Sequence, residues 1–294
     1  MNQKFLILIT TLFVSSLANA DVTKQSLDIT GEKISEYVSN LIPGEGLTET
    51  SIKINDATSD EINFSILGVR DISSTDRSNI FTQFSLANEE INSSGRITGN
   101  LGFGYRRLSE DENFMFGANT FYDRDLTENH ERLGLGLEAK ASIVDITLNN
   151  YKKITDSKVI DGTREQVLSG WDYNLTTQIP RAPWASFNYK GYKWEAEKAA
   201  QDSSGHVYSL ELDLTNSLEF IVSIDNSTVG GVKDVALAEI NYVYPPKDKS
   251  MVMTDGLSDD LFEKENMKQK LKEKVRRQNK LAVEIQGAVI FTKK

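Results

Sequence analysis

Residues 96–107 read RITGNLGFGYRR, and this stretch decides the fold. Its odd positions carry Ile97, Leu101, Phe103 and Tyr105, whereas its even positions carry arginine, threonine, asparagine and glycine. Successive side chains of a β-strand point to opposite faces, so a period of two separates the apolar residues from the polar ones. The stretch therefore predicts a strand with one apolar and one polar face.

The same alternation recurs along most of the chain. The predicted strands cover 52–54, 62–69, 80–86, 96–107, 114–122, 132–141, 144–153, 171–178, 185–193, 207–214, 218–225 and 235–244. Polar segments connect them and no helical pattern separates them, so we expect an antiparallel up-and-down order. Closing about 12 such strands into a barrel removes both unpaired edges. The expected fold class is therefore all-β, a single-chain antiparallel β-barrel, and the aromatic placement described below favours the transmembrane kind.

The first twenty residues have the features of a cleaved export signal. Lys4 precedes an apolar stretch at 5–17, and Ala18-Asn19-Ala20 gives the small-x-small pattern that signal peptidase recognises. No later segment approaches the ~20 uninterrupted apolar residues that a membrane-spanning helix needs. Any membrane residence of the mature chain must therefore use strands.

Composition excludes several classes of function. The chain has 33 Lys plus Arg against 43 Asp plus Glu, a net charge of −10, which argues against nucleic acid as a partner. It has no cysteine and two histidines, His130 and His206, and we find no catalytic motif of the hydrolase, zinc-protease or nucleotide-binding kind. Both histidines fall in polar turns, where we expect solvated side chains rather than a lipase site. We therefore expect no enzyme activity, no metal and no cofactor.

The alternation by itself fits two environments. In a soluble sandwich the apolar face points inward, whereas in a membrane barrel it meets lipid and the polar face lines the lumen. Aromatic residues lie near the predicted strand ends on the apolar register, where interfacial girdles occur. These residues are Tyr105, Tyr122, Trp171, Tyr189, Tyr242 and Tyr244. Their placement favours the barrel, and a soluble exported all-β binding protein remains an alternative.

Three consecutive runs carry a resemblance to a known family. RITGNLGFGYR at 96–106, FGANTFYD at 116–123 and HERLGLGLE at 130–138 resemble, in order and spacing, the translocator barrel of the intimin and invasin family, the inverse autotransporters. The NNY, GWD and QIP elements at 149–151, 170–172 and 178–180 are similar as well. The resemblance implies a twelve-stranded barrel of the Gram-negative outer membrane, used in type V secretion and cell adhesion. It also implies a C-terminal linker that returns through the lumen.

Ionisable and amide side chains share the inward register of the predicted strands. The lumen-facing candidates are Arg96, Asn100, Arg106, Asn119, Asp123, Arg132, Glu138, Asn149 and Asp172. Opposite charges in this set can pair across neighbouring strands, and we expect this structural role rather than a ligand site. Glycines at 102, 104, 117, 134 and 136 lie among them, and glycine inside a strand marks a close approach of another group. We therefore expect a segment of the protein to need room in the lumen.

The C-terminal region supplies a candidate occupant. Residues 264–294 contain 10 Lys plus Arg and 3 Asp plus Glu (10 − 3 = +7), whereas 21–263 contain 22 and 40 (22 − 40 = −18). Near-helical spacing predicts a helix at 258–280, followed by a short strand at 281–291. The plug or linker candidates are Lys268, Lys272, Arg276 and Arg277. The alternative is a helix solvated in the periplasm.

These observations divide the chain into four expected parts. They are a signal peptide at 1–20, a short periplasmic segment at 21–50, the barrel at 51–245 and a basic helical linker with a terminal strand at 246–294. We expect a membrane anchor or translocator that exports its own C-terminal segment, without a sizeable passenger within the chain. A passive small pore or structural envelope barrel is the alternative. Outer-membrane lipid is the expected partner, the resemblance implies the barrel-assembly machinery and periplasmic chaperones, and the sequence names no receptor.

Overall fold

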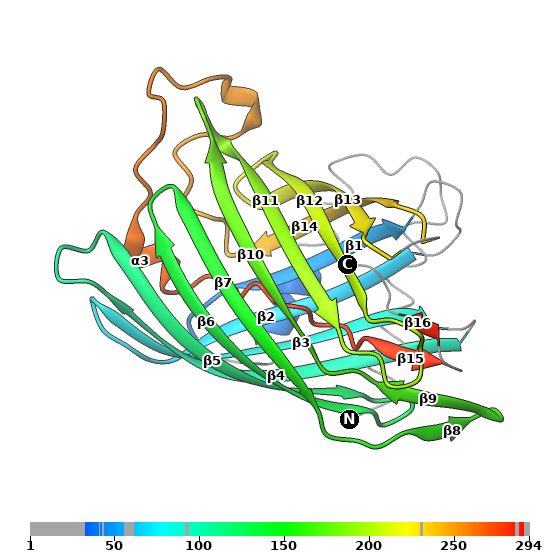
Figure 1. Ribbon diagram of the computed structural model, residues 1–294. Coiled ribbons are helices and arrows are strands. Elements are labelled where there is room, and N and C mark those ends of the chain that lie inside the picture. Colours follow the sequence, from blue (N-terminus) through cyan, green and yellow to red (C-terminus); the bar gives the residue numbers. More distant parts are fainter. Residues whose placement is uncertain are drawn as a thin grey trace.

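A closed barrel forms most of the molecule. The computed structural model describes residues 33–40, 42, 44–55, 62–91, 94–229, 232–285 and 288–290. Within them, twelve antiparallel strands form the barrel wall, and the last wall strand pairs with the first (Figure 1). The predicted signal peptide lies outside the described residues. The expected fold class is confirmed.

The wall strands follow the alternating segments of the sequence. They are β1 (Thr48–Asn55), β2 (Ile62–Ser74), β3 (Ser78–Ile91), β4 (Ser94–Leu108), β5 (Phe114–Asp125), β6 (Glu131–Ala141), β7 (Val144–Lys153), β10 (Gly170–Ile179), β11 (Ala182–Trp194), β12 (Ser203–Asp213), β13 (Leu218–Ser227) and β14 (Val235–Tyr244). Each of the twelve expected ranges overlaps one of them. The wall therefore runs from residue 48 to residue 244, close to the expected 51–245.

The alternation sorts side chains between the outside and the lumen. On β4, Leu101, Phe103 and Tyr105 are 49%, 51% and 46% exposed on the outer surface, whereas Arg106 is fully buried. Tyr122 and Trp171 of the expected aromatic girdles also point outward, while Tyr242 is mostly buried. An apolar outer belt around a polar interior is the arrangement of a barrel in lipid.

The other labelled elements lie at the two ends of the barrel. A small sheet with the order β16-β15-β9-β8 consists of β8 (Lys158–Ile160), β9 (Thr163–Val167), β15 (Val283–Ile285) and β16 (Ala288–Ile290). At the opposite end are the 3₁₀ turn η1 (Met253–Asp255) and the short helix α3 (Met267–Lys270) (Figure 1). The chain between α3 and β15 passes through the barrel interior.

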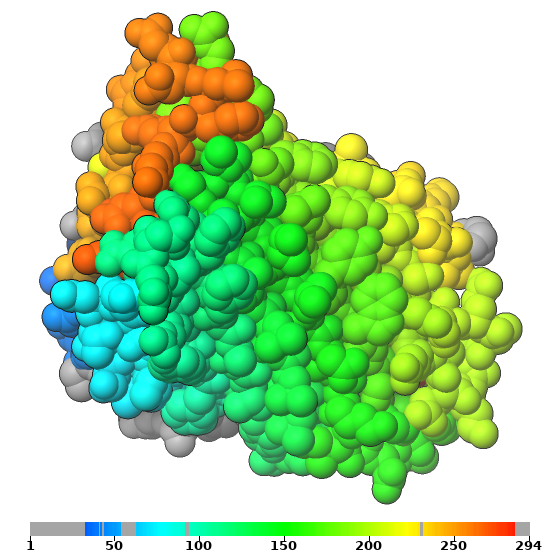
Figure 2. All heavy atoms as spheres, turned by 60° about the vertical axis from the view of Figure 1, so that its left-hand side comes forward, coloured from blue at the N-terminus to red at the C-terminus, as the bar shows by residue number. Residues whose placement is uncertain are grey.

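The two ends differ in the length of their connections. At the α3 end the strands are joined by short turns at 75–77, 109–113, 142–143, 180–181 and 214–217. At the β15 end, the connection at 154–169 contains β8 and β9, and another connection spans 195–202. Residues 247–263 project beyond the rim at the α3 end, in orange in Figure 2. The Arg181 N–H donates to the Leu261 carbonyl, and the Trp184 indole N–H donates to the Gly256 carbonyl.

The described part of the expected periplasmic segment covers the outer wall. Helical residues 33–40 pack on the outer face of β1 and β2, and the stretch 44–47 continues β1 and hydrogen-bonds along β2; together they are here called the N-terminal cover. Val69 packs against the lumen residue Val275, so the next side chain on β2, Arg70, points outward. Arg70 donates to the carbonyls of residues 42 and 47 at 2.9 and 2.7 Å. The cover thereby satisfies a buried cation on the outer face.

Candidate functional site: the linker inside the barrel

The linker, residues 267–282, crosses the lumen from one mouth to the other. Near α3, the Asn79 side chain donates to the Leu271 carbonyl at 3.1 Å. In mid-lumen, the Asn149 side chain donates to the Arg276 carbonyl at 3.0 Å. At the far end, the Leu168 N–H donates to the Ala282 carbonyl at 2.9 Å, just before β15 pairs with β9. The contacts follow the chain in order, so the linker is threaded through the barrel.

Many hydrogen bonds between the wall and the linker involve the linker backbone. The Arg106 guanidinium donates to the carbonyls of Leu271 and Glu273 at 3.1 and 2.5 Å. Asn149, Arg132 and Asn100 likewise donate to the carbonyls of residues 276, 278 and 279. Gln83 and Tyr151 instead accept from the N–H groups of residues 275 and 278. Buried peptide groups need such partners, and here side chains of the wall supply them.

The linker side chains form ion pairs with opposite sides of the wall. Lys270 pairs with Asp145 at 2.7 Å, Lys274 with Glu49 at 2.6 Å, and Glu273 with Lys140 at 2.7 Å. Arg276 makes a two-pronged contact with Glu211, with both N–O distances 2.6 Å. This geometry is the strong form of an arginine–carboxylate pair. The basic linker and the acidic lumen therefore attract each other as their charges predict.

Arg277 lies in a closed socket on the wall. Its Nη2 is 2.7 Å from a carboxylate oxygen of Asp123, and its side chain is 1% exposed. Its guanidinium carbon lies 4.2 Å from the ring centroid of Phe121 and 5.4 Å from that of Tyr151. A Cβ added at Gly134 would lie 3.1 Å from Arg277 Nη2. One of the predicted inward glycines thus makes room for a linker side chain.

All nine lumen-facing candidates are buried in the barrel interior. Five of them contact the linker directly, namely Asn100, Arg106, Asp123, Arg132 and Asn149, and Glu138 is held by Arg106. Asp172 accepts hydrogen bonds from Asn149 and Tyr151, and Asn119 lies against Gly136. Arg96 is at the β15 end, where it pairs with Asp125 and Glu165 instead of the linker.

The four plug candidates fall into two groups. Arg276 and Arg277 lie in mid-lumen, as described above. Lys272 lies at the α3 mouth, where it is 3.0 Å from both Glu45 and Asp71. Lys268 lies away from the Arg277 socket, with its Nζ 3.8 Å from a carboxylate oxygen of Glu112. The structure thus brings two of the four predicted residues into the lumen.

The prediction of a helix at 258–280 is wrong except at four residues. Only Met267–Lys270 is helical, and its side-chain cap is Asn266. The 12 residues from 271 to 282 would span about 18 Å as an α-helix, less than the ~30 Å hydrocarbon core. As extended chain they reach about 40 Å, which crosses it. The expected terminal strand is likewise replaced by the hairpin of β15 and β16, with 291–294 outside the described residues.

Both histidines also differ from the expectation of solvated turns. His130 is fully buried, with Nε2 3.2 Å from a carboxylate oxygen of Glu165. His206 lies on the outer register of β12 and stacks on Tyr189 at a centroid distance of 5.6 Å. Among the described residues there is no cluster of His, Asp and Glu suited to a metal ion. No helix in the described part of the chain is long and apolar enough to cross a membrane.

Two groups of functional residues escaped the sequence analysis. Phe81 and Phe121 occupy the polar register, opposite Gly104 and Gly102, and this pairing of an aromatic ring with a glycine was a usable signal. Glu284 anchors the terminal hairpin by accepting N–H donors from residues 197, 198 and 199 at 2.7–3.2 Å. No pattern in the sequence pointed to that contact, because a loop of irregular structure supplies the donors.

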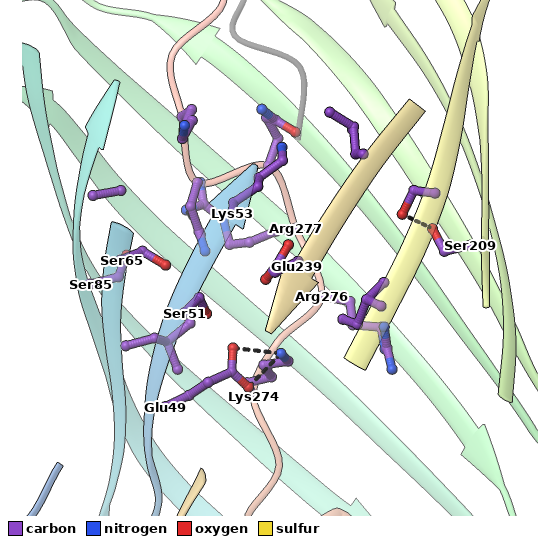
Figure 3. A pocket seen from close by; sticks show the side chains of 18 of the residues that line it. Glu49, Ser51, Lys53, Ser65, Ser85, Ser209, Glu239, Lys274, Arg276 and Arg277 are labelled. Carbon is purple, nitrogen blue, oxygen red and sulfur yellow. Dashed lines mark hydrogen bonds and ion pairs between the residues drawn. The ribbon is translucent and has the colours of Figure 1, made fainter. Parts of the chain in front are cut away.

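A cavity remains beside the linker. Its volume is about 130 Å³. It lies on the side of the lumen formed by β1, β2, β12, β13 and β14 (Figure 3). Small polar side chains line much of it, including Ser51, Ser65, Ser85 and Ser209. The Lys274–Glu49 ion pair borders it. The linker therefore fills one side of the lumen and leaves the other side partly open.

Comparison with known proteins gives three consistent results. Residues 13–279 match the model of the family "Inverse autotransporter, beta-domain". A putative attaching and effacing protein homolog of Escherichia coli K12 is 33% identical over 102 residues, which are 33% of this chain and 34% of that protein. Invasin of Yersinia enterocolitica is 26% identical over 141 residues, which are 47% of this chain and 16% of invasin. The matches thus span about a third or less of these relatives.

A solved structure supports the fold. It comes from work described as "Unveiling the Mechanism Behind the in-meso Crystallization of Membrane Proteins" and has a TM-score of 0.66. At 17% identity, the superposition covers 82% of this chain and 99% of that one. Because the family model covers most of the residues, including the whole barrel, the chain belongs to the inverse autotransporter β-domain family and is an outer-membrane barrel.

Proposed function

We propose that this barrel anchors and displays its own C-terminal segment on the cell surface. The observation that carries the proposal is the path of the linker, which enters the barrel beside α3 and leaves it at β15. In outer-membrane barrels the short turns are periplasmic and the longer loops extracellular. The short turns lie at the α3 end, so the terminal hairpin of β15 and β16 is on the extracellular side.

An epitope tag placed after Lys294 tests this orientation. We expect an antibody to reach the tag on intact cells, with a tag in the 247–263 projection reachable only after permeabilisation. The reverse pattern, or a C-terminal tag that needs permeabilisation, contradicts display. The barrel-assembly machinery and periplasmic chaperones are the partners that the family suggests for insertion. A receptor for the displayed segment is a separate question that surface binding assays address.

The second candidate function is a small passive pore, and the cavity beside the linker favours it. Its volume of about 130 Å³ is enough for several waters, since one water needs roughly 10–15 Å³ of such space. Conductance in planar bilayers separates the two functions. We expect the intact protein to conduct weakly and a variant lacking 264–294 to conduct strongly, since the linker occupies the lumen. Equal conductance in the two proteins contradicts the linker as a plug.

We further propose that the protein is not an enzyme. His206 stacks on the Tyr189 ring at the outer surface, and His130 lies buried with its Nε2 3.2 Å from the Glu165 carboxylate. A phospholipid-hydrolysis assay on refolded protein, compared with His206→Ala and His130→Ala, tests this. We expect no turnover in any of the three proteins; activity lost in either variant contradicts the proposal. Because the chain is an outer-membrane barrel, the alternative of a soluble exported all-β binding protein is wrong.

A further inference from the structure

Two kinds of contact hold the linker, and they differ in what they recognise. The wall side chains described above bond peptide N–H and carbonyl groups from Leu271 to Asn279. Peptide groups are the same in every residue, so these contacts accept an extended polypeptide of almost any sequence. The contacts to Arg276 and Arg277 instead depend on a guanidinium group.

The Arg277 socket is built for an arginine side chain. Asp123 supplies the charge, and the Phe121 and Tyr151 rings supply flat faces for the planar guanidinium. A second cation, Arg132, lies 2.8 Å from the same carboxylate and stacks on Tyr151. The backbone at Gly134 leaves the space that the guanidinium tip occupies. A lysine ammonium lacks the plane and the fork that this arrangement fits.

The second arginine is held on a different part of the wall. Arg276 is bound by Glu211 of β12, whereas Arg277 is bound by Asp123 of β5. Consecutive side chains of an extended chain point in opposite directions, so the dipeptide spans the lumen between the two carboxylates. A shift of one residue would turn both guanidinium groups away from their partners. A shift of two residues would bring Val275 or Asn279 to the Arg277 socket.

The sequence contains this dipeptide once at the C-terminal end. No arginine other than Arg276 and Arg277 follows Arg181 in the chain. The lysines at 268, 270, 272 and 274 precede the dipeptide along the linker. The lumen therefore holds two guanidinium sites, and the exported part of the chain offers them one matching pair.

We propose that Arg276 and Arg277, with Glu211 and Asp123, are the stop that fixes how far the C-terminal segment is exported. The backbone contacts guide extended polypeptide through the lumen, and the arginine pair arrests it at one register. This inference rests on the proposed display function. It assigns positioning roles to four residues and makes the stop depend on the place of the two arginines in the sequence.

Relocating the arginine pair tests the stop. The four changes Arg276→Gln, Arg277→Gln, Gln278→Arg and Asn279→Arg move the pair two residues toward the C-terminus. The Val275 N–H donates to Gln83 Oε1 at 2.7 Å, so positions 83 and 275 report the native register. The chain has no cysteine, and a disulfide can therefore form only between introduced thiols.

We expect Gln83→Cys to cross-link with a thiol at position 275 in the native background and with a thiol at position 277 in the relocated one. The cross-link thus shifts by two residues. A linker that is held by general charge or packing would keep the cross-link at 275 in both backgrounds, and that result would overturn the stop. The four relocation changes lie on the linker and Gln83→Cys is the one change in the wall, so heat-modifiable migration on gels checks that each variant is folded.

Two further variants make the outcome specific. We expect Arg276→Glu alone to weaken the 83–275 cross-link. Swapping the charges of the Arg276–Glu211 pair, with Glu211→Arg and Arg276→Glu together, should restore it. Lys272→Gln removes a linker cation at the mouth and should leave the register unchanged. A tag after Lys294 read on intact cells reports display separately. If the tag is internal while the cross-link still shifts, the display function fails and the register sites stand. If the tag is external and the cross-link does not shift, display stands and the stop fails.

Discussion

The ring of Phe121 lies directly over Gly102 of the neighbouring strand, where an added Cβ would be 2.3 Å from the ring. The same ring meets the guanidinium of Arg277, whose central carbon lies 4.2 Å from the ring centroid. The absence of a side chain at Gly102 therefore sets the position of the ring that contacts the linker.

Replacing Gly102 should loosen the linker as well as the wall. We expect Gly102→Val to displace the Phe121 ring and to destabilise the barrel by about 1–3 kcal/mol, the usual cost of overpacking. The measurement is the temperature at which the folded, fast-migrating band is lost on gels. Gly99→Ala is the matched control, because its Cβ would meet Leu86 and Leu126 on the outer surface at 3.4–3.5 Å. Equal midpoints for the two variants would contradict the close approach.

Arg106 should be the most costly arginine to remove from β4. Its guanidinium bonds both oxygens of Glu138 at 2.9 Å, stacks on Phe81 and donates to two linker carbonyls. Arg106→Met leaves Glu138 buried without this partner, which costs ~3–5 kcal/mol in comparable pairs. Urea unfolding in detergent micelles measures the loss. The adjacent, exposed Arg107→Met should change stability by less than about 0.5 kcal/mol.

The terminal hairpin should detach in acid. Burial raises the pKa of Glu284, but the N–H donors of residues 197–199 outweigh it and hold the pKa below the ordinary value of 4.5. A carboxylate with a lowered folded-state pKa contributes stability above its unfolded pKa and loses it as the pH falls through the folded one. We therefore expect the hairpin to be held fully above pH 4.5 and released progressively below it.

Hydrogen exchange at amides 197, 198 and 199 measures this release, after correction for the intrinsic pH dependence of exchange. Protection in the native protein should fall below pH 4.5, while Glu284→Gln should show weaker protection with no such step. Asp202, in the same loop, has a lowered pKa through the Lys193 side chain, so Asp202→Asn is the control for loop titration. If the step persists in Glu284→Gln, another group is responsible.

The N-terminal cover and Arg70 should be energetically coupled. Deleting residues 33–40 removes Ser39 and the packing of Ile34 and Val38, and leaves Arg70 facing lipid in part. Arginine on the lipid face costs up to ~2–4 kcal/mol, depending on depth. We expect the deletion to destabilise the native barrel more than the Arg70→Met barrel. Additive effects in this double-mutant cycle would contradict the coupling.

The strands were predictable because each depends on a local pattern. The period of two in 96–107 fixes which side chains of β4 face the lumen, and glycine at 134 indicated that another group approaches there. The sockets were not predictable in the same way. Arg277 meets Asp123, Phe121 and Tyr151 through strand pairing and the depth of linker insertion, which no single segment of the sequence specifies.

The prediction of a C-terminal helix was wrong for a related reason. Charges distributed at 258–280 satisfy helix rules, but an isolated helix gains little from them compared with the ion pairs that the lumen offers. Lys274 and Arg276 lie beyond α3, where the chain is not helical, and each pairs with a carboxylate on the wall. His130 shows the same limit, because its burial depends on Glu165 in a distant hairpin.

The N-terminal cover has a consequence for the surrounding bilayer. Around most of the circumference, acyl chains meet leucine, phenylalanine and isoleucine side chains. Over β1 and β2 they meet a strip of polypeptide that seals hydroxyl groups and a guanidinium beneath it. The annulus of lipid around this barrel is therefore interrupted on one flank, and the protein presents the membrane with two unlike sides.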